Sequence, residues 1–200
     1  MQHKCKVTVI DKKCFSDLQA EYLNDPKSGP CPCYEVGDEF IFERYGTRDD
    51  FWHCGINTLT NSNNNNIYIA GGKNFPQCSE AWDAISRYIY TALQGGSIMR
   101  HWTNDERMMI ACCSDGTRPV IFKIERIDYN AIYIDNKDIL NLAEDDKNKI
   151  IQSLKAISAV REVVFRENFI EVILDNRGVP EEMLKNAVEL AGKFKVLKID

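Results

Sequence analysis

Residues 160–174 read VREVVFRENFIEVIL, and this stretch decides the fold of the C-terminal part of the chain. β-Branched and aromatic residues dominate 160–166 and 169–174, which is typical of strands. Glu167 and Asn168 are polar residues that stand between the two runs. A two-residue polar connection between such runs predicts a β-hairpin.

The segments on either side of the hairpin each predict one strand and one helix. Residues 131–134, AIYI, form a short strand, and a helix is predicted to begin at Glu144 because acidic residues fill its first turn. After the hairpin, Pro180 opens a second helix, Gly192 ends it, and residues 195–199 form a last strand. This order predicts a ferredoxin-like βαββαβ domain, in which two helices cover one face of a four-stranded antiparallel sheet.

In order and length, this part resembles the small heavy-metal-associated domains, including a Val-x-x-Val-x-Phe run into the hairpin. Those domains bind copper through a Cys-x-x-Cys pair in the loop after the first strand. The equivalent residues here, 135–143, contain no cysteine, so copper transfer is not expected. The sheet face that the helices leave open is a common surface for association, and we expect a homo-oligomer or a protein partner to bind there.

The composition is that of an ordinary globular chain with room for two domains. Its 200 residues are 44% hydrophobic and 28% charged, which argues against a disordered or collagen-like protein. The 25 basic and 30 acidic residues give a formal net charge of −5, which argues against nucleic-acid binding. Neither a signal peptide nor an apolar run of membrane-spanning length is found, so a cytoplasmic location away from membranes is expected.

The cysteines divide the chain. All eight lie before residue 114, as do the three histidines and the three tryptophans, whereas residues 128–200 contain none of these types. This shift predicts a cysteine-bearing α+β domain of unknown function at 1–127 and the ferredoxin-like domain at 128–200. In a reducing cytosol cysteines are thiols, metal ligands or redox groups more often than disulfides. The eight are Cys5, Cys14, Cys31, Cys33, Cys54, Cys78, Cys112 and Cys113.

The first part of the cysteine-bearing domain predicts a strand, a helix, a stiff loop and a second strand. Alternating residues at 5–10 indicate the first strand. Ser16 and Gln19 have the spacing of a capping box, which predicts the start of the helix. Residues 29–33, GPCPC, are held in extended or turn conformation because each residue before a proline avoids the helical region. Residues 35–42 then predict a turn that leads into the second strand.

The second part predicts an irregular segment and a long helix. Residues 44–75 lose periodicity, and an asparagine-rich tip within them suggests a hairpin over 58–69. The clearest helix of the domain begins at Cys78 or Ser79 and ends at Gly95, since its apolar residues recur at helical spacing.

A second hairpin is predicted around Asp115-Gly116, a strong two-residue turn signal between 109–113 and 120–124. Because side chains alternate along a strand, Cys112 and Cys113 are expected to point to opposite faces of the sheet.

Four blocks of this domain carry a resemblance: GPCP at 29–32, VGDEF at 36–40, CSEAWDAI at 78–85 and ACCSDGTRPVIFKIER at 111–126. Together they resemble an uncharacterised family of short cysteine-containing proteins from anaerobic bacteria, over residues 4–127. The resemblance implies no activity. It implies that Cys31, Cys78, Cys112 and Cys113 are the motif thiols, and that the other four cysteines are peculiar to this chain.

One hypothesis for these thiols is a zinc or iron–sulfur site. Cys31 on a proline loop, Cys78 at a helix N-terminus and Cys112 or Cys113 beside a tight turn are all places where backbone N–H groups stabilise thiolates. No Cys-x-x-Cys pair occurs, so the ligands would have to converge from distant segments.

Two alternatives remain open. A thiol-dependent enzyme could use Cys78 with a lowered pKa, His53 or His101 as the base, and Arg118 to bind an anionic substrate. The other alternative is that most of the cysteines are small buried hydrophobic residues. In that case the protein is a two-domain binding or assembly module.

Overall fold

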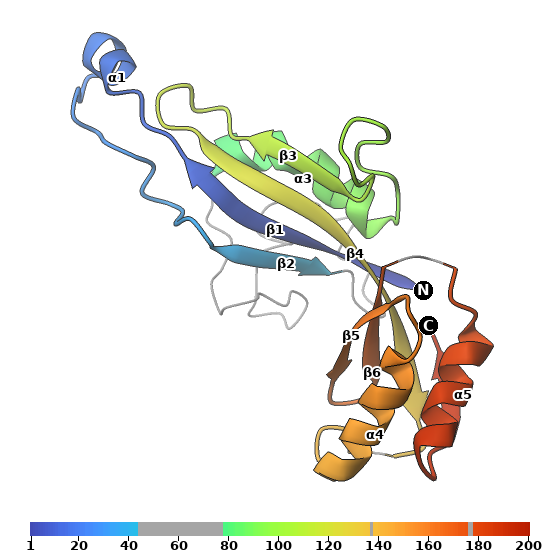
Figure 1. Cartoon of the computed structure of the whole chain (residues 1–200). Coiled ribbons are helices and arrows are strands. Elements are labelled where there is room, and N and C mark those ends of the chain that lie inside the picture. Colours follow the sequence, from blue (N-terminus) through green and yellow to red (C-terminus); the bar gives the residue numbers. More distant parts are fainter. Residues whose placement is uncertain (44–77, 137, 176–177) are drawn as a thin grey trace. The chain divides into compact units, whose positions relative to one another are not determined.

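The structure is a computed structural model that describes residues 1–43, 78–136, 138–175 and 178–200. The fold is mixed α+β, as predicted, and the chain divides into two compact units (Figure 1). The N-terminal unit is His3–Arg126, and the C-terminal unit is Ile127–Asp200 with Met1–Gln2. The division falls between Arg126 and Ile127, one residue before the predicted boundary.

The N-terminal unit is a sheet with one long helix packed on it. Its described elements are β1 (Gln2–Lys12), α1 (Ser16–Tyr22), β2 (Glu39–Glu43), α3 (Ser79–Leu93), β3 (Met108–Cys112) and β4 (Val120–Ile134). The strands lie in the order β2-β1-β4-β3, with β2 antiparallel to β1 and β3 antiparallel to β4. Helix α3 lies along one face of this sheet (Figure 1).

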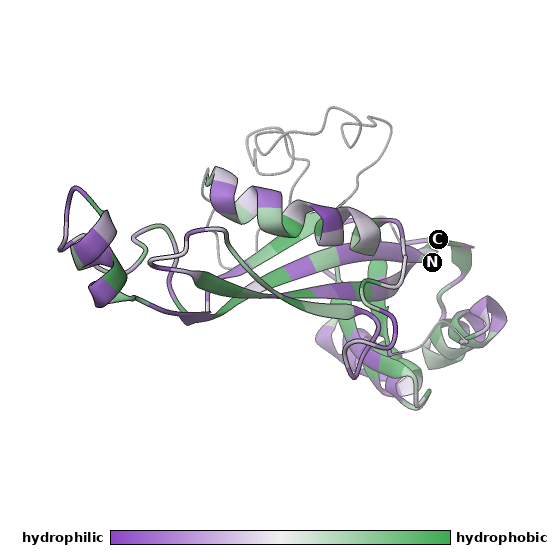
Figure 2. Cartoon of the chain, turned by 90° about the horizontal axis from the view of Figure 1, so that it is seen from above, coloured by the Kyte–Doolittle hydropathy of each residue, from purple (hydrophilic) through white to green (hydrophobic). Residues whose placement is uncertain are grey.

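Apolar side chains that alternate along the strands and recur at helical spacing in α3 form the core of this unit. Cys5, Val7 and Val9 of β1 are buried, while the residues between them are less so. Ile85 and Ile89 of α3 are fully buried against the sheet. Figure 2 shows hydrophobic and hydrophilic residues alternating around α3, as expected for a helix with one face on a core.

Both ends of α3 are fixed by specific residues. Cys78 is the N-cap, and its carbonyl accepts a hydrogen bond of 2.9 Å from the Trp82 N–H. Beyond the other end, Gly95 has φ of +71°, a left-handed conformation that suits glycine. The buried Arg126 guanidinium donates to the carbonyls of Gly95 (3.2 Å) and Gly96. A cation is therefore placed just beyond the C-terminal end of the helix, where the helix dipole is negative.

The predicted capping box at Ser16 and Gln19 is wrong. Phe15 is the N-cap of α1, and within the described chain no side chain caps that end. Gln19 is instead buried and hydrogen-bonded to Gly29, so its amide is not available to the helix N-terminus. The helix itself lies where it was expected.

The predicted two-residue turn at Asp115-Gly116 is also wrong. Strand β3 ends at Cys112 and β4 begins at Val120, so seven residues connect them. The Asp115 carboxylate accepts hydrogen bonds from the N–H groups of Thr117 (2.8 Å) and Arg118 (3.1 Å), which folds residues 115–118 into a turn of their own. A side chain that binds its own downstream backbone competes with the tight hairpin turn.

The C-terminal unit has the predicted βαββαβ order. Its elements after β4 are α4 (Glu144–Lys155), β5 (Val160–Phe165), β6 (Ile170–Leu174), α5 (Glu181–Ala191) and β7 (Val196–Ile199). The strand order is β7-β4-β6-β5 with all pairs antiparallel, which is the ferredoxin-like arrangement. Helices α4 and α5 lie side by side on this sheet (Figure 1). Their core includes the fully buried Leu154 and Leu184.

The second face of this sheet is less open than expected. Its central side chains, Ile127, Tyr129, Ala131 and Ile173, are all buried. The Tyr129 hydroxyl also donates a hydrogen bond of 2.8 Å to Gln2 of the same unit. The middle of this face is therefore not a free surface, and association through the C-terminal sheet stays a prediction.

The suggested hairpin over 58–69, together with His53 and Cys54, lies outside the described residues. Among the helices of the described ranges, none is long and apolar enough to cross a membrane.

Candidate thiol site

Cysteines from three segments of the N-terminal unit converge around one buried tyrosine. Tyr34 is almost completely buried, and its ring packs edge-on against Phe122 with ring centres 5.2 Å apart. Burial raises the pKa of Tyr34, and the neighbouring thiols raise it further. Those thiols are Cys78, Cys33, Cys31 and Cys113. We call these four cysteines the thiol site.

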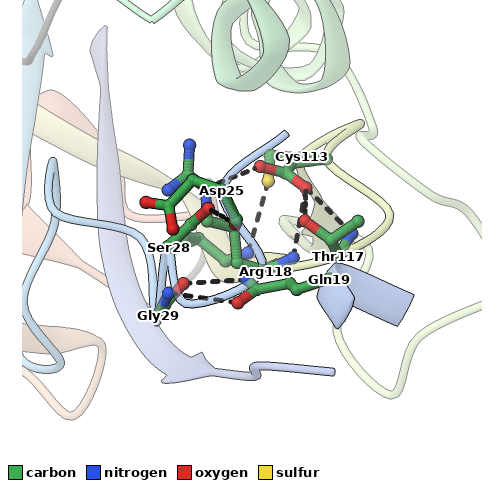
Figure 3. A network of polar contacts seen from close by, with 9 residues as sticks. Gln19, Asp25, Ser28, Gly29, Cys113, Thr117 and Arg118 are labelled. Carbon is green, nitrogen blue, oxygen red and sulfur yellow. Dashed lines mark hydrogen bonds and ion pairs between the residues drawn. The ribbon is translucent and has the colours of Figure 1, made fainter. Parts of the chain in front are cut away.

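The proline loop carries two of the four cysteines and is anchored by Gln19. The Gln19 amide nitrogen donates to the Gly29 carbonyl (2.9 Å), and the Gly29 N–H donates to the Gln19 side-chain oxygen (3.0 Å) (Figure 3). Gly29 has φ of +72°, so the chain turns sharply as it enters the loop. Pro30 and Pro32 follow, and they restrict the backbone that presents Cys31 and Cys33.

Cys31 and Cys33 are neighbouring thiols of one loop, with only Pro32 between them. Burial raises the pKa of Cys33, and the neighbouring Cys31 and Cys78 raise it further. The direct interaction of the two side chains acts in the same direction. Arg118 opposes this shift with its positive charge. Cys33 is exposed and Cys31 is partly buried, so both sulfurs lie near the surface.

Cys78 joins the site from the N-terminus of α3. The carbonyl of Glu80, in the first turn of α3, accepts hydrogen bonds from the Ser114 N–H (3.3 Å) and hydroxyl (3.4 Å). These bonds tie the start of the helix to the segment after β3. Cys78 is partly buried and packs against the same hydrophobic core as Cys31.

Cys113 and Cys112 have opposite environments, as the alternation predicts. Cys113 is buried in the core, and its sulfur accepts a hydrogen bond of 3.3 Å from the Val120 N–H. Cys112 is exposed and its thiol donates to the Cys113 carbonyl at 3.2 Å. Partial burial and the neighbouring Cys113 raise the pKa of Cys112. Cys113 therefore belongs to the thiol site, whereas Cys112 is not among the thiols around Tyr34.

Arg118 is the cation of the site, and Asp115 holds it in place. The Arg118 Nε donates to the Asp115 carboxylate at 3.0 Å, while the Thr117 hydroxyl donates to the same carboxylate at 2.9 Å. Partial burial by itself would raise the pKa of Asp115, but the bonds from Thr117 and Arg118 outweigh it and lower that pKa. The guanidinium also lies within electrostatic range of Cys31 and Glu80.

The structure thus brings together three of the four cysteines predicted for a metal site, Cys31, Cys78 and Cys113, and leaves out Cys112. It adds Cys33, which the sequence did not single out. Over residues 1–43, 78–136, 138–175 and 178–200, no group of three or more His, Cys, Asp or Glu side chains is placed to hold a metal ion. A zinc or iron–sulfur site therefore lacks a ligand set within these residues.

Histidine does not complete the site in the described chain. His53 lies outside the described residues, and His101 is exposed in a loop with φ of +61°. His101 makes no hydrogen bond or ion pair with any residue that the structure describes. The predicted use of His101 as a base for Cys78 has no geometric support.

Cys33 was missed for an identifiable reason. The Cys-Pro-Cys spacing is too short for the usual metal-binding pairs, so it gave no metal signal. The two prolines that stiffen its backbone were the only sequence clue that both sulfurs would be held together.

Comparisons of the chain with protein-family models, with curated proteins and with solved structures gave no significant match. The resemblance of residues 4–127 to short cysteine-containing proteins from anaerobic bacteria accordingly stays a prediction.

Proposed function

We propose that the N-terminal unit carries out thiol–disulfide exchange, with Cys31 and Cys33 as the reacting pair. The observation that carries this proposal is a pair of free cysteines, separated only by Pro32, of which Cys33 is exposed and Cys31 partly buried. Exchange needs one accessible thiol and a second thiol within reach of the mixed disulfide that forms. A loop restrained by Pro30, Pro32 and the Gln19–Gly29 pair keeps both thiols in position before the reaction.

The reaction has two steps. The Cys31 thiolate attacks one sulfur of a disulfide in another molecule, which forms a mixed disulfide and releases one thiolate. Cys33 then gives its proton to solvent and attacks the Cys31 sulfur, so that a Cys31–Cys33 disulfide forms and the second thiolate leaves. The protein loses two electrons and two protons, and the attacked disulfide accepts both electrons.

The raised pKa of Cys33 supports one order of attack. Burial and the neighbouring Cys31 and Cys78 raise the pKa of Cys33, so Cys33 favours its protonated form. A thiol that keeps its proton is a poor nucleophile, because the thiolate is the attacking species. Cys31 is therefore the attacking residue and Cys33 the resolving residue.

Peptide mapping after oxidation tests the pairing. The reduced protein is treated with 2-hydroxyethyl disulfide, alkylated with iodoacetamide and digested with trypsin. Residues 28–44 then form a peptide whose only cysteines are Cys31 and Cys33, and residues 74–87 form one whose only cysteine is Cys78. We expect peptide 28–44 to lose two hydrogens and to carry no alkyl group.

Serine variants supply the controls. Cys33→Ser should accumulate the mixed disulfide on Cys31, because the resolving thiol is gone. Cys112→Ser should oxidise as the unchanged protein does, since Cys112 is exposed and is not among the thiols around Tyr34. A fully alkylated peptide 28–44 would overturn the proposal, and so would a dominant cross-link between peptides 28–44 and 74–87.

A further inference from the structure

Arg118 presents an unused hydrogen-bonding edge beside the reacting thiols. Its Nε is bound to Asp115 at 3.0 Å, and its side chain is 32% exposed. Among the described residues, its two terminal amino groups have no hydrogen-bond partner. Guanidinium groups bind carboxylates through two parallel N–H donors, so an edge of this kind is suited to a carboxylate.

The position of Arg118 relative to the thiols is set by the turn after β3. Asp115 binds the Thr117 and Arg118 N–H groups and the Arg118 side chain together, which fixes both the backbone and the guanidinium. From there the positive charge acts on Cys31 and on Cys33. The Phe15 N–H at the start of α1 donates to the Thr117 carbonyl at 2.8 Å, and Gln19 of α1 is bonded to Gly29, so the turn with Arg118 and the loop with Cys31 are both attached to α1. A disulfide attacked by Cys31 would therefore carry its substituents toward this guanidinium.

We infer that Arg118 makes the site selective for disulfides that carry a carboxylate near the sulfur. This inference rests on the proposed exchange reaction and names the class of its substrate. The carboxylate would accept hydrogen bonds from the terminal amino groups of Arg118 while the neighbouring sulfur meets Cys31.

Two carboxylates on the protein limit the strength of this selection. Asp115 and Glu80 both lie close enough to act on the Arg118 charge. Their negative charges weaken the long-range attraction between Arg118 and an anionic disulfide. Selection of the anionic disulfide therefore depends on direct contact with the guanidinium. A charge-assisted hydrogen bond at a partly exposed site stabilises by about 1 kcal/mol, which corresponds to a rate preference of about fivefold.

Reaction rates with matched disulfides test the inference. The probes are 3,3′-dithiodipropionate, which is anionic, and 2-hydroxyethyl disulfide, which is neutral. The measured quantity is the ratio of their rates of forming the Cys31–Cys33 disulfide, because the neutral probe corrects for any change in the thiols themselves. Arg118→Gln should lower this ratio about fivefold, and Arg118→Lys should lower it less.

Glu80→Gln supplies a test of opposite sign. Removing this exposed carboxylate takes away a competing charge, so the ratio should rise about twofold, while the Glu80 backbone carbonyl keeps its bonds to Ser114. An unchanged ratio in both Arg118→Gln and Glu80→Gln would overturn the inference while exchange itself continues. If neither probe oxidises peptide 28–44, the exchange proposal fails and the selectivity falls with it.

Discussion

Gln19 shows how a single buried side chain can hold a reactive loop. Its amide forms two hydrogen bonds to the backbone of Gly29, ten residues along the chain. These bonds replace the hydrogen bonds to water that the Gln19 amide and the Gly29 backbone lose when they are covered. The residue therefore links the fold of α1 to the placement of Cys31 and Cys33.

Replacing this amide should destabilise the N-terminal unit. Gln19→Leu keeps the size of the side chain but leaves the Gly29 N–H and carbonyl without their partners, which should cost about 1–3 kcal/mol. The unfolding free energy from urea titration measures this loss. Gln152→Leu, at an exposed position of α4, is the matched control and should change it by less than about 0.5 kcal/mol. Equal effects in the two variants would show that Gln19 contributes nothing through Gly29.

Some residues of the thiol site could be predicted from the sequence. Cys31 and Cys78 were recognisable because a proline loop and a helix N-terminus are visible in the sequence. Alternation separated Cys112 from Cys113 correctly. The pairing of Gln19 with Gly29 could not be predicted, because the same Ser-x-x-Gln spacing is typical of a capping box and only tertiary packing decides which partner the amide finds.

Helix α3 depends on a cation supplied by another element. Arg126 of β4 is buried and donates to the carbonyls of Gly95 and Gly96, just beyond the helix. Its charge also helps to lower the pKa of Asp105, although the hydrogen bond from Arg107 is the larger cause. The carbonyls of Tyr90, Thr91 and Ala92 in the last turn already accept backbone N–H groups, so Arg126 satisfies the two carbonyls that follow the helix. Its positive charge complements the negative end of the helix dipole.

Removing this cation should weaken α3 measurably. Arg126→Met keeps an apolar stem but loses the charged hydrogen bonds, and the unfolding free energy should fall by about 2–3 kcal/mol. Arg126→Lys should lose less, since it keeps the charge. Arg87→Met, at an exposed position of α3, controls for the loss of an arginine and should have little effect. If Arg126→Met proves as stable as Arg87→Met, the capping role is refuted.

Most elements were predictable because their periodicity and end signals agree. The hairpin of β5 and β6 and the helices α4 and α5 lie where apolar spacing, proline and glycine placed them. Strand β4 was predicted as two short strands, since Asp128 and Asn130 interrupt its apolar run. Both polar residues are buried within the sheet, and β4 is one strand of 15 residues. Burial of polar side chains in a strand depends on tertiary partners that the sequence does not display.

At the scale of the whole molecule, the described residues form two large hydrophobic cores, besides the small cluster of Ile127, Tyr129, Ala131 and Ile173. One is centred on α3 and contains Ile89, and the other lies under α4 and α5 and contains Leu154. The two clusters share no residue, although β4 contributes residues to both. Packing lost from one core therefore leaves the contacts of the other core unchanged.

Hydrogen exchange of single-core variants should reveal this separation. Ile89→Ala and Leu154→Ala each remove a fully buried side chain, and each should cost about 2–5 kcal/mol. Ile89→Ala should lower the protection of amides in residues 120–126 of β4 together with α3, because these pack in the first core. Leu154→Ala should lower the protection of residues 132–134 together with α4 and α5, because Ile132 and Ile134 pack in the second core. If either variant lowers protection equally along the whole of β4, that strand couples the two cores into one cooperative unit, and the independence argued from their separate packing does not hold.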